Sequence, residues 1–355
     1  MEKSLKVDEK TLPKTFVLEL TQRCNNRCLY CYTVWGNPEL GYDQYCKGEM
    51  SVGEIKEIIT KLQNEIPIEN IALSGGEPLL RKDLHEILSF LKNREINTVI
   101  ITNGTLLTKE RVAETMIGGN YEVTLLSYQR EVHDRLAGRP GAWDETIDGL
   151  TNIRQAGGGF IAVFVATKLN YNDFFKTAEL AIALGAYGLM YNRMNLGAYN
   201  MKYAEKLLPT VDMVHENLEM LEEIEKKYEL PTVVSVVIEP CVVNLDKYKK
   251  INFGWCPLGG ENSYFTIDPI GNIRICNHSP VVLGNLKNDS FIDIFNNHPH
   301  VKRFRDTLPK ECINCDPLLK DMCKGGCKAA GEQCYGSLTR VDPFVTLNRK
   351  PDLLS

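Results

Sequence analysis

The chain has 355 residues, with 41 Lys and Arg against 46 Asp and Glu, which gives a net charge of −5 without a long run of one sign. This length allows one large domain and a smaller one, and the charge balance argues against nonspecific nucleic-acid binding, which uses a basic surface. No apolar stretch approaches the roughly 20 residues that span a bilayer, and residues 1–6 lack the apolar core of a signal peptide. These features predict a soluble, cytoplasmic protein with no nucleic acid and no membrane as partner.

Alternating strands and helices follow a short charged segment. Residues 1–14 are predicted to be a loose leader. The predicted strands are Thr15–Leu20, Ile68–Leu73, Thr98–Thr102, Glu122–Ser127, Phe160–Thr167 and Tyr187–Asn192. The predicted helices are one capped by Ser51, with Glu54 completing a capping box, and then Asp83–Lys92, Thr108–Ile117, Trp143–Ala156, Asp173–Leu184 and Val211–Tyr228.

This alternation sets the expected fold class, which is α/β. Strands that alternate with helices through short turns pair in parallel, with the helices on the outside. Six strand–helix units are two short of a closed eightfold barrel, so residues 15–239 are predicted to form a partial (β/α)6 TIM-like barrel. Ligands of such sheets gather at the carboxyl ends of the strands.

The pattern changes beyond Pro231. Thr232–Ile238 is β-branched and predicts one more strand or a bridge to the next domain. The sequence after Cys256 is rich in Gly, Pro, Asn and Cys, with short helices predicted at Phe291–Phe295 and Val301–Leu308 and a hairpin around residues 265–276. A region so short of apolar core is expected to be held by metal. We therefore place a second, cysteine-rich domain at 240–345 and a tail at 346–355.

Twelve cysteines in a cytoplasmic chain indicate metal or redox chemistry rather than disulfides. Three of them, Cys24, Cys28 and Cys31, crowd one loop directly after the first strand. A cubane iron–sulfur cluster normally takes one thiolate on each of its four irons, so three thiolates leave one iron open. A structural zinc loop would need a second Cys or His pair nearby, and only the isolated Cys46 follows. The spacing favours a cluster over zinc or incidental buried thiols.

The motif Cys24-x3-Cys28-x2-Cys31, with Tyr30 before its last cysteine, resembles the signature loop of radical S-adenosylmethionine (SAM) enzymes. The resemblance implies an oxidoreductase in which the open iron chelates SAM. The [4Fe–4S] cluster reduces the sulfonium, and the resulting 5′-deoxyadenosyl radical takes a hydrogen atom from the substrate. It also implies an anaerobic or reducing setting and an electron donor such as flavodoxin or ferredoxin.

Further motifs support this resemblance at the ends of the predicted strands. Ser74-Gly75-Gly76-Glu77-Pro78 is similar to the family's GGEP segment, in which Glu77 would face the ammonium of SAM, and Thr102-Asn103-Gly104-Thr105 is similar to its TNG segment. The SAM contacts that the resemblance implies are Tyr30, Gly75, Gly76, Glu77, Pro78, Asn103, Thr124, Asn170 and Arg193.

Ordinary alternatives remain open for several of these residues. The glycine segments also suit tight turns, and Arg193 also suits a salt bridge at the barrel rim. Thr124 replaces the usual Ser of the family. His133 fits a structural partner of its loop as well as a catalytic acid or base, so no catalytic residue is assigned.

Seven cysteines of the C-terminal region resemble a SPASM domain, which binds two auxiliary [4Fe–4S] clusters, although the gap between Cys315 and Cys323 is seven residues rather than five. The family pairing implies Cys256, Cys276 and Cys327 for the first cluster. It implies Cys312, Cys315, Cys323 and Cys334 for the second. The fourth ligand of the first cluster stays open between Cys241, another side chain, solvent and substrate. Two zinc sites are the alternative for this field.

The expected function is oxidative modification of a ribosomally made peptide or protein, by C–C or C–S bond formation or dehydrogenation, with SAM and three [4Fe–4S] clusters. Because only about 14 residues precede the first strand, a separate peptide-recognition protein is a possible partner. The alternatives are a small-molecule substrate such as a porphyrin or an aminoglycoside precursor, and a non-catalytic electron-transfer or scaffold protein.

Overall fold

The structure is a computed structural model of the chain, and it describes residues 12–35, 48–256 and 263–348. Most of the predicted leader, and Cys46, lie outside the described residues. Eleven strands form one sheet in the order β11-β10-β9-β1-β2-β3-β4-β5-β6-β7-β8. The strands are β1 Thr15–Thr21, β2 Asn70–Gly75, β3 Asn97–Thr102, β4 Gly119–Thr124, β5 Phe160–Ala166, β6 Ala186–Arg193, β7 Thr232–Val234, β8 Asn252–Phe253, β9 Tyr264–Ile267, β10 Asn272–Arg274 and β11 Val282–Asn285.

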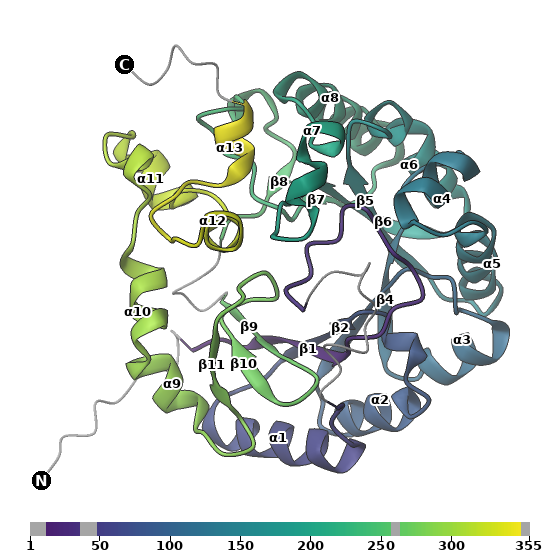
Figure 1. Cartoon of the computed structure of the whole chain (residues 1–355). Helices are drawn as coiled ribbons and strands as arrows, with labels where there is room; N and C mark the ends of the chain where they lie inside the picture. The colour runs from purple at the N-terminus through teal and green to yellow at the C-terminus, as the bar shows by residue number, and fades with distance from the viewer. Residues whose placement is uncertain (1–11, 36–47, 257–262, 349–355) are drawn as a thin grey trace, which may run out of the picture.

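Strands β1 to β6 pair in parallel and in chain order, and the helices between them lie on the outer side of the curved sheet (Figure 1). Strands β1 and β6 do not pair with each other, so the barrel is open, and the predicted partial (β/α)6 barrel is confirmed. The helices are α1 Val52–Glu65, α2 Leu84–Asn93, α3 Lys109–Thr115, α4 Arg130–Ala137, α5 Ala142–Gln155, α6 Phe174–Ala183, α7 Ala204–Leu207, α8 Val211–Tyr228, α9 Phe291–Asn297, α10 Pro299–Asp306, α11 Pro317–Cys323, α12 Lys328–Tyr335 and α13 Pro343–Asn348.

Helix α1 shows how the local sequence specifies these elements. The Ser51 side chain accepts a hydrogen bond from the Glu54 backbone N–H, and the Glu54 carboxylate accepts one from the Ser51 backbone N–H, which is the predicted capping box. Apolar residues at helical spacing then form the face that packs against the sheet. Its fully buried members are Ile55, Ile58, Ile59 and Leu62.

Several elements differ from the sequence-based expectation. Strand β4 ends at Thr124, three residues before the predicted end, because the chain leaves β5 after Leu125: the Leu126 N–H bonds to His133 and the Ser127 hydroxyl to Asp173. Helix α4 was not predicted, since it has only eight residues before its Gly138 cap. The short helices α7, α11, α12 and α13 were also missed, because each has at most eight residues and shows little apolar periodicity.

Strands from the C-terminal region extend the barrel sheet at both edges. Strand β9 pairs in parallel with β1, and β10 returns antiparallel to β9, so the predicted hairpin is confirmed. The buried Arg274 of β10 forms an ion pair with Glu19 of β1. At the other edge, β7 and β8 continue the parallel pairing beyond β6, so the position of the predicted domain boundary, 239/240, falls between two strands of one sheet.

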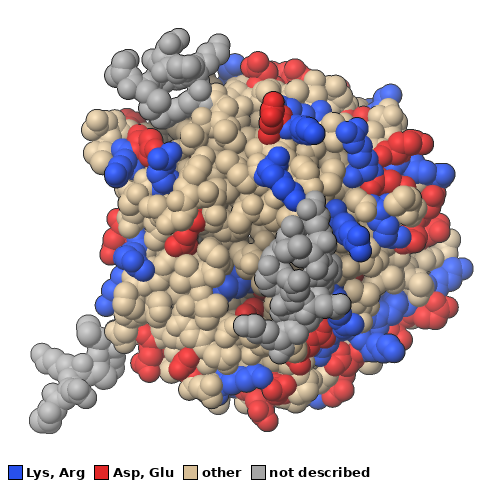
Figure 2. Space-filling model, in the orientation of Figure 1, with Lys and Arg blue, Asp and Glu red and all other residues tan. Residues whose placement is uncertain are grey.

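Two surface properties bear on partners. No described helix combines the length and apolar character that a membrane crossing requires. Figure 2 shows acidic and basic side chains mixed around the periphery of the face drawn in Figure 1, without a large patch of one sign on that face.

Candidate functional site

The three N-terminal motifs meet at one edge of the sheet. Cys24 follows the end of β1 by three residues, the GGEP segment begins at the end of β2, and Asn103 directly follows β3. Because β1, β2 and β3 are parallel neighbours, their carboxyl ends lie side by side. The sequence-based expectation that the motifs gather at the carboxyl ends of the strands is therefore confirmed.

The two glycines of the GGEP segment lie directly against the chain that leads into Cys24. The Gly76 N–H donates to the Thr21 carbonyl at 2.8 Å, and the Glu77 N–H donates to the Arg23 carbonyl at 2.8 Å. A Cβ atom added to Gly76 would lie 2.1 Å from the Arg23 carbonyl oxygen, and one added to Gly75, whose φ is +125°, would lie 2.4 Å from that of Thr21. Glycine is thus required here so that two backbone segments can touch.

Gly76→Ala is expected to displace the chain before Cys24 and to remove most of the iron bound by Cys24, Cys28 and Cys31. The reason is that backbone, unlike a flexible side chain, cannot move away from the new methyl group at low cost. Iron analysis and SAM cleavage measure the effect. Gly53→Ala is the matched control, since its new Cβ would meet only the Ser51 hydroxyl at 3.8 Å in helix α1. Full iron content and unchanged SAM cleavage in Gly76→Ala would contradict this prediction.

The carboxylate of Glu77 is buried and accepts three hydrogen bonds from the protein. The Leu79 N–H and the Thr102 hydroxyl donate to one oxygen, and the Asn103 N–H donates to the other at 2.9 Å. Burial raises the pKa of Glu77 to about 7, although these donors oppose the shift. In this structure Glu77 therefore links the end of β2 to the end of β3, and its predicted contact with the ammonium of SAM stays a prediction.

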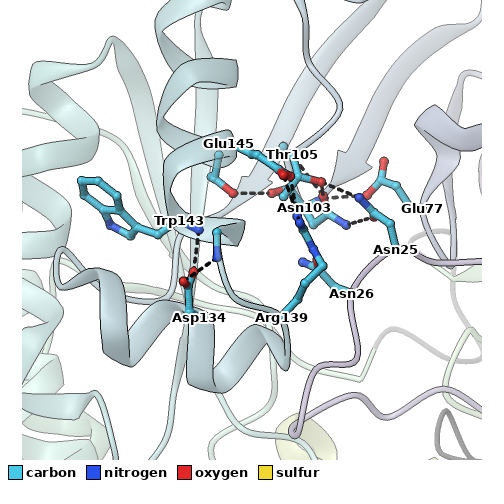
Figure 3. A network of polar contacts seen from close by, with 12 residues as sticks. Asn25, Asn26, Glu77, Asn103, Thr105, Asp134, Arg139, Trp143 and Glu145 are labelled. Carbon is cyan, nitrogen blue, oxygen red and sulfur yellow. Dashed lines mark hydrogen bonds and ion pairs between the residues drawn. The ribbon is translucent and has the colours of Figure 1, made fainter.

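Asn103 connects the strand ends to the cysteine loop (Figure 3). Its side-chain NH2 group donates to the side-chain oxygen Oδ1 of Asn25 at 2.9 Å and lies 4.0 Å from the Cys24 sulfur. Thr105 closes the network: its hydroxyl donates to the Asn103 side chain at 2.6 Å and accepts from the Asn25 amide at 2.8 Å. The segment after β3 thus holds Asn25, which lies inside the Cys24–Cys31 motif.

The far side of the cysteine loop is held by the end of helix α4. The Arg27 N–H donates to the Ala137 carbonyl at 2.9 Å, and a Cβ added to Gly138 would lie 2.1 Å from the Arg27 carbonyl oxygen. Arg139 donates through Nε to the buried Asn26 side chain at 2.8 Å and pairs with Glu145 of α5 (Figure 3). The sequence-based expectations did not include these contacts with the loop.

His133 of α4 has a structural position. Its ring is 2% exposed, and Nδ1 accepts a hydrogen bond from the Leu126 N–H at 3.3 Å. Burial lowers the pKa of His133 to about 4, so the ring is neutral near pH 7. This arrangement supports the role as a partner of its loop rather than as an acid or base.

Acidification is expected to destabilise the protein through His133. Because the unfolded histidine binds a proton near pH 6.5 and the folded one only near pH 4, the stability from its neutral form is present above pH 6.5 and is lost as the pH falls toward 4. Between pH 7 and 5.5 the loss is roughly 1 kcal/mol. Anaerobic denaturation of His133→Gln and the unsubstituted protein at both pH values measures it. An identical pH dependence of the two proteins would contradict the prediction.

The remaining predicted SAM contacts have different surroundings. Thr124 is the last residue of β4 and is half-buried, Pro78 begins the turn after Glu77, and the Tyr30 carbonyl accepts from Asn200 at 2.8 Å. Asn170 is 1% exposed. Its side-chain oxygen accepts from the Thr167 N–H, and its side-chain NH2 group donates to the carbonyls of Leu126 and Val165. These residues stay predicted contacts of SAM.

Arg193, at the end of β6, is fully buried within the protein. Its guanidinium donates to the Val237 carbonyl at 3.0 Å and to Asp342 at 2.7 Å, and it pairs with Glu239 at 3.3 Å. It also lies 4.4 Å from the ring centroid of Phe344. Its donors are directed to the C-terminal region, so in this structure the predicted SAM contact has protein partners instead.

The thiols of Cys24, Cys28 and Cys31 lie near one another at this edge. Burial, together with the neighbouring Cys31 thiol, raises the pKa of Cys28 to about 12, and burial and the Cys28 thiol raise the pKa of Cys24. Three thiolates cannot share this position without a cation, and bound iron supplies that charge. The donor set therefore fits the iron–sulfur cluster that the spacing predicts.

Three cysteines of the C-terminal region line one cavity of about 430 Å³ together with Tyr32, which directly follows Cys31. They are Cys256, Cys276 and Cys327, the three residues that the family pairing implies for the first auxiliary cluster. The Asn277 amide donates to the Tyr32 hydroxyl at 2.7 Å. The loop of Cys24, Cys28 and Cys31 is called the SAM loop below. Tyr32, the residue after it, thus lines the same cavity as the first auxiliary cysteine set.

Cys312, Cys315 and Cys323 line a second, small cavity, whereas Cys334 is not among the residues that line either cavity. Among the described ranges 12–35, 48–256 and 263–348, no three Cys, His, Asp or Glu side chains are grouped as they would be around one metal ion. A zinc ion needs such a compact set, while a cubane cluster takes one thiolate on each of four irons.

Comparisons with known proteins identify two domains in the chain. The profile of the Radical SAM superfamily matches residues 18–181, and the SPASM iron–sulfur cluster-binding domain matches residues 256–316. An AdoMet-dependent heme synthase of Methanosarcina barkeri is 27% identical over 94% of this chain and 96% of its own length. A PqqA peptide cyclase of Bradyrhizobium diazoefficiens is 25% identical over 95% of this chain and 87% of its own length.

The fold also matches solved structures. The crystal structure of Streptococcus suis SuiB bound to its precursor peptide SuiA superimposes with a TM-score of 0.74 over 94% of this chain and 75% of SuiB, at 16% identity. At that identity the match supports the fold alone. The two sequence profiles and the enzymatic relatives exclude the electron-transfer or scaffold alternative. The chain belongs to the radical SAM superfamily and is a SPASM-type radical SAM enzyme that uses SAM, a [4Fe–4S] cluster and auxiliary iron–sulfur chemistry.

Proposed function

We propose that this enzyme oxidatively modifies a ribosomally made peptide, forming a C–C or C–S bond or a double bond, with three [4Fe–4S] clusters. The cluster at Cys24, Cys28 and Cys31, with SAM bound, supplies a 5′-deoxyadenosyl radical that takes a hydrogen atom from the substrate. The observation that supports an oxidative outcome is that Tyr32, the residue after Cys31, lines the same cavity as Cys256, Cys276 and Cys327. A short distance between the substrate radical and an auxiliary cluster would favour transfer of the radical's unpaired electron to that cluster.

The chain's own residues set the conditions for this chemistry. Asn25, Asn103 and Thr105 hold the cysteine loop against the strand ends through side-chain hydrogen bonds, so the thiols keep one geometry. Burial keeps His133 neutral in helix α4, whose last residues bond to this loop. Because these groups are already bonded to the protein, they need no reorganisation when SAM binds.

The lining of the 430 Å³ cavity favours a peptide over a porphyrin. Its volume lies within the range of small-ligand sites, about 300–1,000 Å³. Among the described residues that line it, Lys328 is the one cation, and its ammonium donates to the Phe304 carbonyl at 2.8 Å. A porphyrin with several carboxylates would need more cations than this. The PqqA peptide cyclase relative and the peptide-bound SuiB structure point to the same substrate class.

A porphyrin substrate remains the second candidate, because the AdoMet-dependent heme synthase matches 96% of its own length to this chain. In both cases the reductant is expected to be flavodoxin or ferredoxin. For a peptide, a separate recognition protein is a further expected partner.

Mass spectrometry after anaerobic turnover tests the proposal. The reduced, reconstituted enzyme is incubated with SAM and either the short peptide encoded beside its gene or an iron porphyrin. Peptide modification predicts 5′-deoxyadenosine in proportion to a peptide that has lost two hydrogen atoms. An unchanged peptide together with a porphyrin of altered mass would contradict it and establish the second candidate. A variant lacking Cys24 controls for chemistry that does not depend on SAM.

A further inference from the structure

Cys241 is held in a tight turn that follows β7. The Val242 and Val243 N–H groups both donate to the Glu239 carbonyl, at 3.0 and 3.1 Å. Both ends of the turn are anchored, since Glu239 is 1% exposed and pairs with Arg193, and Val243 is fully buried. The turn therefore holds the exposed Cys241 at a defined position.

This turn is pressed against the turn that follows helix α11. Lys324, Gly325 and Gly326 have consecutive positive φ angles of 53°, 88° and 78°. A Cβ added to Gly326 would lie 2.2 Å from a carboxylate oxygen of Glu239. Only glycine permits this approach, which brings the segment of Cys241 next to Cys323 at the end of α11.

Four cysteines line the small cavity between these two turns. The cavity is lined by Cys241 together with Cys312, Cys315 and Cys323. The Cys323 thiol receives backbone hydrogen bonds from Gly325 and Gly326, the type of contact that stabilises a thiolate ligand.

Cys334 has different surroundings. Helix α12 begins after Cys327, which lines the first auxiliary cavity, and Cys334 lies seven residues further along the same helix. At 1.5 Å of rise per residue this is about 10 Å from Cys327. Cys334 packs partly buried against the core instead, and neither cavity includes it among its described lining residues.

We propose that Cys241 is the fourth thiolate of the second auxiliary [4Fe–4S] cluster, with Cys312, Cys315 and Cys323, and that Cys334 is not a ligand. The assignment crosses the domain order of the sequence, since Cys241 precedes the region matched by the SPASM profile. It also withdraws Cys241 as the fourth ligand of the first auxiliary cluster. The inference rests on the proposal that the enzyme holds three clusters.

Cys241→Ser and Cys334→Ser, compared with the unsubstituted enzyme, test the assignment. Each protein is reconstituted anaerobically, its iron, sulfide and zinc are measured, and its clusters are examined by electron paramagnetic resonance (EPR). The unsubstituted enzyme is expected to hold about twelve irons. Cys241→Ser is expected either to lose about four irons or to show the signal of a three-iron cluster after oxidation, and Cys334→Ser to match the unsubstituted enzyme.

The outcomes separate the two levels of the proposal. A plateau near eight irons in the unsubstituted enzyme would overturn the three-cluster proposal itself. Twelve irons and an unaltered EPR spectrum in Cys241→Ser, or loss of the cluster in Cys334→Ser alone, would overturn the assignment of Cys241. Zinc in place of the missing iron would overturn it as well. When SAM is added, the EPR signal of the SAM-binding cluster is expected to change in Cys241→Ser as it does in the unsubstituted enzyme, which shows that the variant remains folded.

Discussion

Replacing Cys24, Cys28 and Cys31 together by Ala is expected to reduce 5′-deoxyadenosine formation to the background level. The three thiolates are the predicted attachment of the cluster that activates SAM, and a cubane cluster needs thiolate ligands to stay bound. Bound iron should fall from about twelve to about eight per chain, because the C-terminal cysteine sets are separate. Iron analysis and chromatographic detection of 5′-deoxyadenosine measure both effects.

The barrel is expected to stay folded in this triple variant. The loop keeps its backbone bonds to α4, including Arg27 to Ala137, and its side-chain bonds through Asn25 to Asn103 and through Asn26 to Arg139. Cys46→Ala is the control for loss of a cysteine that belongs to none of the predicted sets. SAM cleavage retained in the triple variant would refute the site, and loss of all iron would show that the clusters are not independent.

Arg193→Met is expected to lower the free energy of unfolding by about 3–5 kcal/mol. The substitution leaves the carboxylates of Glu239 and Asp342, both at most 1% exposed, without the guanidinium that pairs with them. Removing one partner of a buried ion pair costs this much because the remaining charge has no compensation. Arg130→Met is the matched control: its pair with Asp144 is about half exposed, so the expected loss is about 0–1 kcal/mol.

Anaerobic denaturant titration measures these differences, and SAM affinity is measured on the same samples. Because burial of the carboxylates causes the loss, adding Asp342→Asn to Arg193→Met should recover part of the stability. If Arg193→Met were no less stable than Arg130→Met but bound SAM weakly, Arg193 would be a SAM contact and the structural account would be wrong.

The buried pair also explains how the two halves of the chain are connected. Arg193 ends β6, Glu239 lies in the turn that carries Cys241, and Asp342 precedes α13. The Arg274–Glu19 pair makes a second connection at β1, on the other edge of the barrel sheet. Both auxiliary cysteine sets are therefore placed relative to the SAM loop by buried ionic contacts as well as by strand pairing.

Short-range patterns in the sequence were sufficient for the family, the barrel and the first metal loop. Alternation of strands and helices requires parallel pairing, and parallel pairing brings the ends of β1, β2 and β3 to one edge. The spacing of Cys24, Cys28 and Cys31 acts within eight residues, so the sequence alone indicates that the three thiols lie near one another.

Only the tertiary structure decided which distant groups meet. Glu77 and Asn103 bond across two strand ends, Arg193 reaches Asp342 across 149 residues, and Cys241 joins cysteines more than 70 positions later. Spacing along the chain carries no information about such contacts, because they depend on how helices and turns pack, and the same cysteine order is compatible with several pairings. The sequence therefore predicted the kind of chemistry, and packing determined which side chains are available to perform it.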